Sequence, residues 1–380
     1  MEGCSYALFS AQYPPHMGGI ESFTQGLASA LVERGNDVLV VTNDTDGVGS
    51  GIVRERGVDV ARLPCRPLIG GRLPLALHNA SCSEVLSEVS KRKLDGVLVN
   101  ARFYPHSLLG MRVAREHGLS PVVLDHGSAY LTFGNPVLDV GVRMWEHVIT
   151  MMGKSYGPRY YGISEKSVDW LRAFGIRACG VIPNAIDAAS YRGSASSRDF
   201  RGELGVAGSA PLVVFVGRLI PEKGVRSIIE ASRDKSLAAF GVTFVLAGDG
   251  PLAGEVRAAE GGALRWVGRL SREDTAALLL QANLLCLPSR SEGFSTTLLE
   301  AASCACPALV TDVGGARELI PDGSYGKIMA DASSRSIVRD IVALLERREN
   351  LAAMGRRGQR LVSELFSWDN TARAIEQACL

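Results

Sequence analysis

The sequence lacks several features that would place it in a common class at once. No run of eighteen apolar residues could cross a membrane as a helix, and the first residues have neither the basic stretch nor the apolar core of a secretory signal. The eight cysteines include no Cys-x-x-Cys pair, which excludes the usual zinc spacings and gives no disulfide framework for a chain of 380 residues. We therefore expect a cytosolic protein.

The chain also has little net charge. Its 41 Lys and Arg residues against 40 Asp and Glu residues give a formal charge of +1, which argues against a dedicated nucleic-acid binder. One local bias stands out, because residues 51–115 hold eleven basic and five acidic side chains, a net charge of +6. This segment is either ordinary surface variation or a patch that faces anionic lipid or a phosphorylated acceptor.

Three familiar motifs are missing. The glycines at 248, 250 and 254 do not have dinucleotide-binding spacing, and no P-loop lysine follows a glycine run. A Gly-x-Ser-x-Gly nucleophile elbow is also absent. The pair Asp44-Thr45-Asp46 resembles a metal-binding Asp-x-Asp, but its place after a strand in the first half favours a plain acidic turn, and we predict no metal site.

What the sequence does contain is a repeated strand-then-helix pattern. In the first half, a strand at 5–10, a helix at 22–34 and a strand at 37–42 form one β-α-β unit, which predicts a parallel sheet. Further strands are predicted at 96–100 and 121–125. Ligands bind at the carboxyl ends of such strands, where Gly18-Gly19 and His126 both fall.

The second half repeats the pattern after a polar stretch at 188–210, which we interpret as a domain boundary. Strands are predicted at 211–216, 243–247, 264–267, 284–288 and 307–311. Each is followed by glycine together with charged or polar residues, and this repeated placement indicates a ligand-binding edge.

One stretch of the second half carries two carboxylates around a tight turn. The strand at 284–288 leads through Glu292-Gly293-Phe294 into a helix at 297–303 that contains Glu300. Free N–H groups at the start of a helix suit a phosphate. Ionised Glu accepts several hydrogen bonds, which suits sugar or ribose hydroxyls. If the helix begins early, both glutamates lie on one face of it.

In this order and spacing, the motifs resemble those of a family 4 retaining glycosyltransferase with the GT-B fold, over nearly the whole chain up to Trp368. The motifs that carry the resemblance are Gly18-Gly19-Ile20-Glu21, Asp125-His126-Gly127, Asn184-Ala185-Ile186-Asp187, Gly217-Arg218-Leu219, Glu222-Lys223-Gly224, Gly248-Asp249-Gly250-Pro251, Gly268, Glu292-Gly293-Phe294 and Glu300-Ala301. The resemblance implies an α/β protein of two Rossmann-like domains that face each other across a cleft. Residues 1–187 would form the acceptor-side domain, 188–210 an interdomain linker region, 211–362 the donor domain, and 363–380 a helix crossing back to the first domain.

The resemblance further implies a nucleoside diphosphate sugar, UDP- or GDP-linked, as co-substrate, with neither cofactor nor metal. The residues implied at the reaction are His126, Arg218, Lys223 and Glu292. The residues implied in donor binding are Gly18, Gly19, Gly217, Arg218, Lys223, Gly248, Leu270, Glu292, Gly293, Phe294, Ser295, Thr296 and Glu300.

In these roles, Glu300 would hold the ribose and Glu292 the transferred sugar, while Arg218 and Lys223 would offset the charge of the leaving diphosphate. His126 would border the sugar, and Glu318 would lie near the nucleotide. The family is thought to react on one face of the sugar, with the leaving phosphate helping to deprotonate the acceptor, so the resemblance implies no side-chain nucleophile or general base.

Some matters stay open at this point. Ser295 and Ala305 stand where family members often have glycine, which bears on the identity of the donor sugar. The acceptor is expected to be a sugar or a lipid-linked glycan of a cell-surface pathway, with a peripheral contact to the inner face of a membrane as one possibility. The alternatives are a non-catalytic binder of nucleotide sugars and a GT-B-like nucleotide-sugar epimerase, which would need further acid and base groups beside His126.

Overall fold

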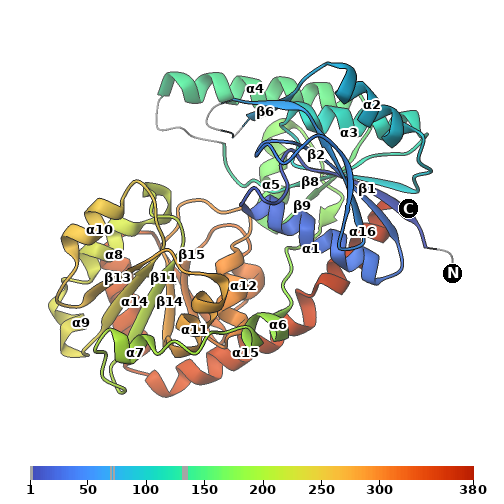
Figure 1. Cartoon of the computed structure of the whole chain (residues 1–380). Helices are drawn as coiled ribbons and strands as arrows, with labels where there is room; N and C mark the ends of the chain where they lie inside the picture. Colours follow the sequence, from blue (N-terminus) through green and yellow to red (C-terminus); the bar gives the residue numbers. More distant parts are fainter. Residues whose placement is uncertain (1–2, 69–70, 72, 131–135) are drawn as a thin grey trace. The chain divides into compact units, whose positions relative to one another are not determined.

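The structure is a computed structural model that describes residues 3–68, 71, 73–130 and 136–380, and it divides the chain into two units (Figure 1). Unit 1 comprises Met1–Ala185 together with Trp368–Leu380, and unit 2 comprises Ile186–Ser367. The C-terminal helix thus belongs to unit 1, although the chain enters it from unit 2. Each unit has its own parallel sheet with helices packed on it.

Unit 1 begins with a strand and ends with the last helix of the chain. Its strands are β1 (Ser5–Phe9), β2 (Asp37–Asn43), β3 (Gly51–Glu55), β4 (Val58–Leu63), β5 (Cys65–Leu68), β6 (Leu73–Ala76), β7 (Gly96–Asn100), β8 (Val122–Asp125), β9 (Arg159–Gly162) and β10 (Gly180–Val181). Its helices are α1 (Gly19–Glu33), α2 (Ala80–Ser90), α3 (Pro105–Glu116), α4 (Pro136–Lys154), α5 (Glu165–Leu171), the 3-10 turn η1 (Arg172–Phe174) and α16 (Trp368–Cys379).

The main sheet of unit 1 has the order β10-β9-β8-β7-β1-β2-β4-β3. All neighbours are parallel except β3, which pairs antiparallel with β4, and β1 meets β2 with Ser5 opposite Asp37. The strand order reverses direction between β1 and β7, because β2 lies on one side of β1 and β7 lies on the other. The loops after β1 and β7 therefore flank the switch point where doubly wound sheets bind ligands.

Two helices close one face of this sheet. In α1, Phe23, Leu27 and Leu31 are buried at helical spacing, and Gly35, with a φ of +83°, follows the end of the helix. The ring of Trp368, at the start of α16, lies 5.8 Å from that of Phe23. Arg34 also donates to Glu376 at 2.7 Å, so α16 is tied to α1 by both packing and charge.

Unit 2 has shorter elements. Its strands are β11 (Leu212–Val216), β12 (Thr243–Ala247), β13 (Leu264–Gly268), β14 (Leu284–Leu287), β15 (Ala308–Thr311) and β16 (Gly326–Met329). Its helices are α6 (Ala188–Gly193), α7 (Phe200–Glu203), the turn η2 (Pro221–Lys223), α8 (Val225–Ala231), α9 (Lys235–Ala239), α10 (Ala253–Ala259), α11 (Arg272–Gln281), α12 (Thr296–Ser303), α13 (Ala316–Leu319), α14 (Ser334–Leu345), the turn η3 (Arg348–Asn350) and α15 (Leu351–Leu365).

The sheet of unit 2 is parallel throughout, in the order β13-β12-β11-β14-β15-β16. Numbered within the unit this is 3-2-1-4-5-6, the order of a Rossmann sheet. The five strands predicted in this half are all present, and the structure adds β16, a four-residue strand. The switch point lies between β11 and β14.

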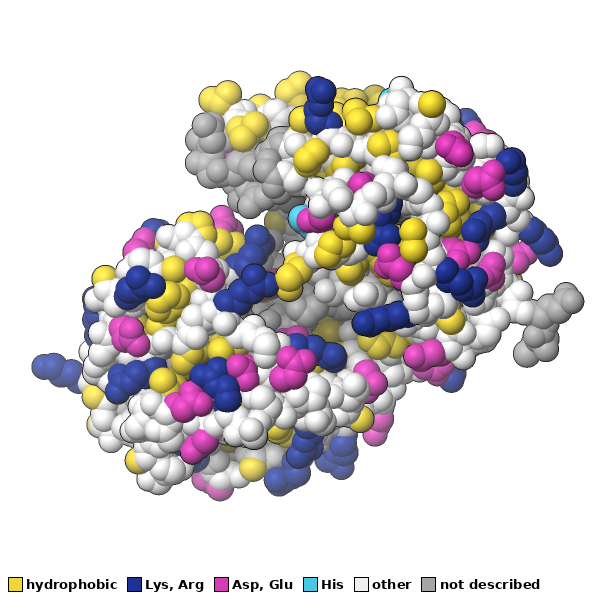
Figure 2. All heavy atoms as spheres, in the orientation of Figure 1, with side chains coloured by type: hydrophobic (Ala, Val, Ile, Leu, Met, Phe, Trp, Pro, Cys, Tyr) yellow, Lys and Arg dark blue, Asp and Glu magenta, His cyan; other side chains and the backbone are white. Residues whose placement is uncertain are grey.

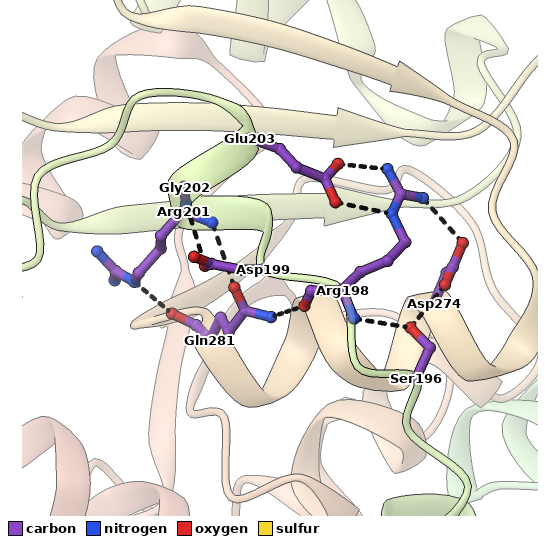
Figure 3. A network of polar contacts seen from close by, with 8 residues as sticks. All are labelled: Ser196, Arg198, Asp199, Arg201, Gly202, Glu203, Asp274 and Gln281. Atoms are coloured by element: carbon purple, nitrogen blue, oxygen red, sulfur yellow. Dashed lines mark hydrogen bonds and ion pairs between the residues drawn. The ribbon is translucent and has the colours of Figure 1, made fainter.

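The segment 188–210, which the sequence predicts as a linker region, is instead part of unit 2. It contains α6 and α7, and a polar network fastens it to α11 (Figure 3). Arg198 donates to Asp274 at 2.8 Å and to Glu203 at 2.6 Å, and the amide of Gln281 donates to the carbonyl of Arg198 at 2.7 Å. Its polar composition therefore reflects side chains that bond to α11 rather than a loose connection.

Candidate functional site

The candidate donor site is built at the carboxyl edge of the unit 2 sheet. The loops after β11 and β14 leave the sheet on either side of the switch point, and backbone hydrogen bonds join neighbouring loops. The N–H of Arg290 donates to the carbonyl of Glu222 at 2.8 Å, and the N–H of Leu219 donates to the carbonyl of Asp249 at 2.8 Å. Three loops thus support one another along this edge.

The structure brings two of the sequence-predicted residues into direct contact. The ammonium group of Lys223, in η2, forms an ion pair with the carboxylate of Glu292 in the loop that follows β14. Both side chains are mostly buried, at 21% and 13% exposed. This pair joins the two loops at the switch point, so a cation and a carboxylate stand together where a ligand of a doubly wound sheet binds.

Helix α12 begins one turn after Glu292. Its N-cap is Ser295, whose hydroxyl accepts the N–H of Leu298 at 3.3 Å, and the helix starts at Thr296. Glu292 therefore precedes the helix instead of sharing a face with Glu300. The first N–H groups of α12 have no partner within the helix, which makes this end a natural site for an anion. Phe294 is buried, with its ring 5.7 Å from that of Phe366, so only its backbone is left to line the edge.

Glu300 lies in the middle of α12, on a partly buried face. Burial raises the pKa of its carboxyl group to about 7, and the cation of Arg272 offsets part of that rise. A carboxyl group with this pKa changes its protonation state near neutral pH. It can accept hydrogen bonds from hydroxyl groups with both oxygens only when it is ionised.

Glycine is required at two places along this edge. A Cβ on Gly248, whose φ is +141°, would stand 1.8 Å from the carbonyl oxygen of Gly217. A Cβ on Gly314, whose φ is +52°, would stand 2.9 Å from the carbonyl oxygen of Glu292. The close approach of these backbones lets the loops after β11, β12, β14 and β15 converge.

The other predicted donor residues lie in the same set of loops. Arg218 is exposed directly after Gly217, Leu270 follows β13, and Gly293 sits between Glu292 and Phe294. Glu318 is partly buried in α13, which begins right after the Gly314-Gly315 turn. Every predicted site residue from Gly217 onward thus lies in a loop or helix start at this edge, apart from Glu300 and Glu318, which lie further into helices.

The remaining predicted residues belong to unit 1. Gly18 is the N-cap of α1, and Gly19 is its first residue, next to the switch point of the unit 1 sheet. A Cβ on Gly19 would meet no atom within 4 Å, so its backbone borders open space. Burial raises the pKa of Glu21 in the same helical turn.

A chain of hydrogen bonds fixes the proton on His126, which follows β8. The hydroxyl of Thr24 donates to the carbonyl of Ile20 at 2.7 Å, so its oxygen accepts the amide N–H of Asn100 at 3.0 Å. The amide oxygen of Asn100 must then accept from His126 Nε2 at 3.0 Å. Burial lowers the pKa of His126 to about 3. The ring is thus neutral, with its proton on Nε2 and a lone pair on Nδ1.

Sequence reasoning missed a buried charge cluster beside this histidine. Arg102, two residues after β7, lies 3.6 Å from Asp125 and donates to Glu146 of α4 at 3.0 Å. Its guanidinium also stacks 3.6 Å from the ring of Phe174. Burial raises the pKa of Asp125 to about 6, and Arg102 opposes that rise. The signal was present, because Arg102 lies two residues after a predicted strand, but burial of its partners shows only in three dimensions.

The acidic pair of the first half behaves as a turn. Asp44 accepts the N–H groups of Val48 and Gly49 at 2.8 and 3.0 Å, which closes the loop after β2. Within residues 3–68, 71, 73–130 and 136–380, no three His, Cys, Asp or Glu side chains are arranged to hold a metal ion. Two cavities of unit 2, of about 540 and 590 Å³, are lined by none of the predicted site residues.

Two units built on parallel sheets, each with predicted site residues at its switch point, define the fold class of the GT-B glycosyltransferases. Comparison with known proteins agrees. A family model described as glycosyltransferase family 4 matches residues 17–190, and one described as glycosyl transferases group 1 matches residues 196–361. The protein belongs to the family 4 glycosyltransferases.

Individual relatives are distant, and some of them match nearly the whole chain. A human relative, one of the subunits of phosphatidylinositol N-acetylglucosaminyltransferase, is 25% identical over 386 aligned residues, covering 96% of this chain and 73% of that protein. Among solved structures, sucrose-phosphate synthase from Thermosynechococcus elongatus has a TM-score of 0.76 at 20% identity, covering 98% of both chains. Anabaena Alr3699/HepE in complex with UDP has a TM-score of 0.71 at 20% identity, covering 99% of this chain and 98% of that one. At this identity the structures show the fold.

Proposed function

We propose that this glycosyltransferase is a retaining, metal-independent enzyme that moves a sugar from a nucleoside diphosphate sugar to an acceptor hydroxyl. The observation that carries the proposal is the ion pair of Lys223 with Glu292 at the switch point of unit 2. It puts a cation for a diphosphate beside a carboxylate for sugar hydroxyls, next to the open N-terminus of α12. Solved structures of similar fold include HepE bound to UDP and to UDP-glucose, which supports a donor of this class.

In the proposed complex, the diphosphate competes with Glu292 for the ammonium group of Lys223. Lys223 and the exposed guanidinium of Arg218 then offset the negative charge that grows on the leaving phosphate as its bond to the sugar carbon breaks. Glu292 turns to the sugar hydroxyls, and Glu300 accepts hydrogen bonds from the ribose. Cationic side chains can supply this stabilisation, a task that other transferases give to a metal ion.

His126 is proposed to act as a hydrogen-bond acceptor. Because its proton is on Nε2 and bonded to Asn100, only Nδ1 remains for a ligand, and a lone pair accepts the proton of a sugar hydroxyl. With a pKa of about 3 the ring is a weak base and stays neutral at neutral pH, so Nδ1 carries no proton to donate to a ligand. We therefore propose that the acceptor proton leaves with the phosphate oxygen, and that the new bond forms on the face from which the phosphate departs.

The biological setting belongs to the same proposal. Relatives include the putative teichuronic acid biosynthesis glycosyltransferase TuaC of Bacillus subtilis, 27% identical over 307 residues, and the human phosphatidylinositol N-acetylglucosaminyltransferase component. These relatives support a role in the synthesis of a cell-surface polysaccharide or a glycolipid, with a glycan or a lipid-linked glycan as acceptor.

The first test is thermal unfolding with UDP, GDP and ADP in turn, with and without EDTA. A nucleotide that binds only the folded chain must raise the midpoint. We expect one nucleotide to do so, EDTA to leave the shift unchanged, and Lys223→Met to reduce it, whereas Lys235→Met, an exposed lysine of α9, should not. No shift with any of the three at millimolar concentration would contradict the donor site. A shift that EDTA abolishes would contradict metal independence alone.

The stereochemistry needs its own measurement. With the donor and a sugar acceptor, the configuration of the new bond can be read by nuclear magnetic resonance, and retention is expected. An inverted product would refute the same-face reaction while leaving donor binding intact. Nucleotide binding without any transfer or epimerised sugar would favour a non-catalytic binder.

A further inference from the structure

Helix α4 of unit 1 carries an unusual concentration of exposed apolar side chains. The exposed large hydrophobic residues on this one helix are Val137, Leu138, Val140, Met144, Trp145, Val148, Met151 and Met152. Val137, Met144 and Met151 are 83%, 65% and 66% exposed. Figure 2 shows hydrophobic side chains, with basic ones among them, along the top of the view where α4 runs in Figure 1.

These side chains form one continuous face. At 3.6 residues per turn, the eight positions fall within an arc of about 160° around the helix axis. Val137, Met144 and Met151 repeat every seven residues. Leu138, Trp145 and Met152 do the same along a neighbouring row, while Val140 and Val148 complete the face. The helix is about 28 Å long at 1.5 Å per residue, so the face extends over its whole length.

The polarity of α4 is inverted relative to an ordinary surface helix, whose apolar stripe faces the core. Its inner side holds Glu146 and Thr150, both buried, and both accept from the guanidinium of Arg102, at 3.0 and 3.3 Å. The core-facing side of the helix thus holds a buried ion pair together with the buried Ile149, and the exposed apolar side chains point outward. Packing within unit 1 does not explain that area.

The charged residues of α4 indicate what kind of surface its apolar face binds. Arg143 lies along one edge of the apolar face, with its guanidinium 5.0 Å from the ring of Tyr130, whereas Asp139 and Glu146 lie on the opposite side of the helix. Lys154 lies on the same edge as Arg143, and its ammonium group donates to the carbonyl of Gly175 at 3.1 Å. Within residues 137–154 the outer face and its edge therefore carry positive charge and no carboxylate. That pattern complements an anionic surface, whereas two copies of this face would bring like charges into one interface.

We propose that the outer face of α4 docks this chain onto an anionic lipid bilayer, lying in the interface with its apolar side chains between the headgroups. Among the residues that the structure describes, no helix is long and apolar enough to cross a membrane, so the contact is peripheral. This membrane-binding surface differs from the basic segment 51–115 that the sequence suggested, where several basic side chains form ion pairs within the protein. Arg62 pairs with Glu55 at 2.7 Å and Arg92 with Asp59 at 2.6 Å.

The test is co-sedimentation of the full chain with phosphatidylcholine vesicles, with and without about one third phosphatidylglycerol. The wild type should bind the anionic vesicles at least about tenfold more tightly than the neutral ones. Met144→Glu combined with Met151→Glu should weaken binding by about tenfold or more, and Arg143→Gln should weaken it only for anionic vesicles. Val53→Glu, at an exposed apolar position of β3, is the matched control and should bind like the wild type.

Trp145 gives a second readout, because it lies on the face. Its emission should shift to shorter wavelength on anionic vesicles, and Trp145→Phe should remove the shift without removing binding. The nucleotide-induced thermal shift, expected to be unchanged in the double variant, shows that the variant is folded and separates this proposal from the donor site. Wild-type binding to neither vesicle, or binding that the double variant retains, would overturn the proposal. A dimer in light scattering that the double variant dissociates, without vesicle binding, would assign the face to a second copy instead.

Discussion

Glu300 offers the sharpest prediction, because its protonation should control donor binding near neutral pH. Burial raises the pKa of this carboxyl group to about 7 in the ligand-free protein. Ribose hydroxyls donate to a carboxylate, so binding requires the ionised form and must lower the pKa of Glu300 from this raised value. About one tenth of the protein is ionised at Glu300 near pH 6 and about nine tenths near pH 8, which makes the dissociation constant about tenfold larger at the lower pH.

The assay is isothermal titration calorimetry with a nucleoside diphosphate sugar of the base identified by thermal unfolding. The sugar ester is needed because the terminal phosphate of a free nucleotide titrates near a pKa of about 6 and would add its own pH dependence. Near pH 6, binding should also release about one proton, which is measured by repeating the titration in buffers of different ionisation enthalpy.

Glu300→Gln is the decisive variant. It should bind about tenfold or more weakly than the wild type near pH 8, since charge-assisted hydrogen bonds are lost, and its affinity should not change between about pH 6 and pH 8. Glu346→Gln, an exposed glutamate of unit 2, should behave like the wild type. An affinity of the wild type that is flat over this range, or a pH dependence that survives in Glu300→Gln, would refute the reasoning.

Three further predictions test other parts of the structure. Lys223→Met should lower kcat by about a hundredfold or more, measured by initial rates of transfer, because an electrostatic donor to the leaving group is lost. Gly248→Ala should unfold at lower denaturant concentration than the wild type, by roughly 3 kcal/mol, since its Cβ collides with the carbonyl of Gly217. Asp125→Asn tests the burial of a charge. The pKa of Asp125 is about 6 in the folded protein and 3.8 as the ordinary value, so folding favours the protonated form. The stability that this difference gives the wild type is fully present below about pH 4 and is lost as pH rises through about 6. Denaturation of both proteins should therefore show their difference moving by about 3 kcal/mol in favour of Asp125→Asn between about pH 4 and pH 7, and no movement would contradict the shift.

Much of the fold was predictable because its signals are local. Runs of branched apolar residues between glycines mark parallel strands, and the strand at 243–247 has the same bounds in the structure as in the prediction. Ser164 and Ser271 cap α5 and α11, and such caps can be read from a sequence because a cap needs only the residue and its next three neighbours. The hairpin of β3 and β4 was missed. Charged residues interrupt its apolar positions and hide a strand whose cation, Arg62, is buried against Glu55.

The segment 188–210, predicted as a linker region, contains α6 and α7 in the structure. Composition at 188–210 is polar, and a polar stretch between apolar runs is typical of an exposed connection. In the structure, the polar groups of Ser196, Arg198 and Arg201 bond to α11 (Figure 3), so the same composition builds the edge of unit 2. Sequence alone does not tell whether a charged side chain meets water or a partner far along the chain.

The site shows the same division between what is local and what is not. The placement of His126 at the end of a strand follows from hydrophobic pattern, yet its chemistry depends on Asn100 and Thr24, which lie on two other elements. The hydroxyl of Thr24 donates its only proton to the carbonyl of Ile20, so it must accept the amide N–H of Asn100. The amide oxygen of Asn100 then accepts from His126, which puts the ring proton on Nε2 and leaves a lone pair on Nδ1. The histidine that the sequence predicts beside the sugar is therefore a neutral ring with a lone pair on Nδ1 in the fold. Replacing Asn100 with aspartate should raise the pKa of His126, because the carboxylate favours the imidazolium, whereas replacing it with alanine should leave the pKa low while freeing the tautomer. Titration of the His126 ring followed by nuclear magnetic resonance distinguishes these outcomes. A proton found on Nδ1 in the wild type would contradict the chain of hydrogen bonds from Thr24 through Asn100 to His126.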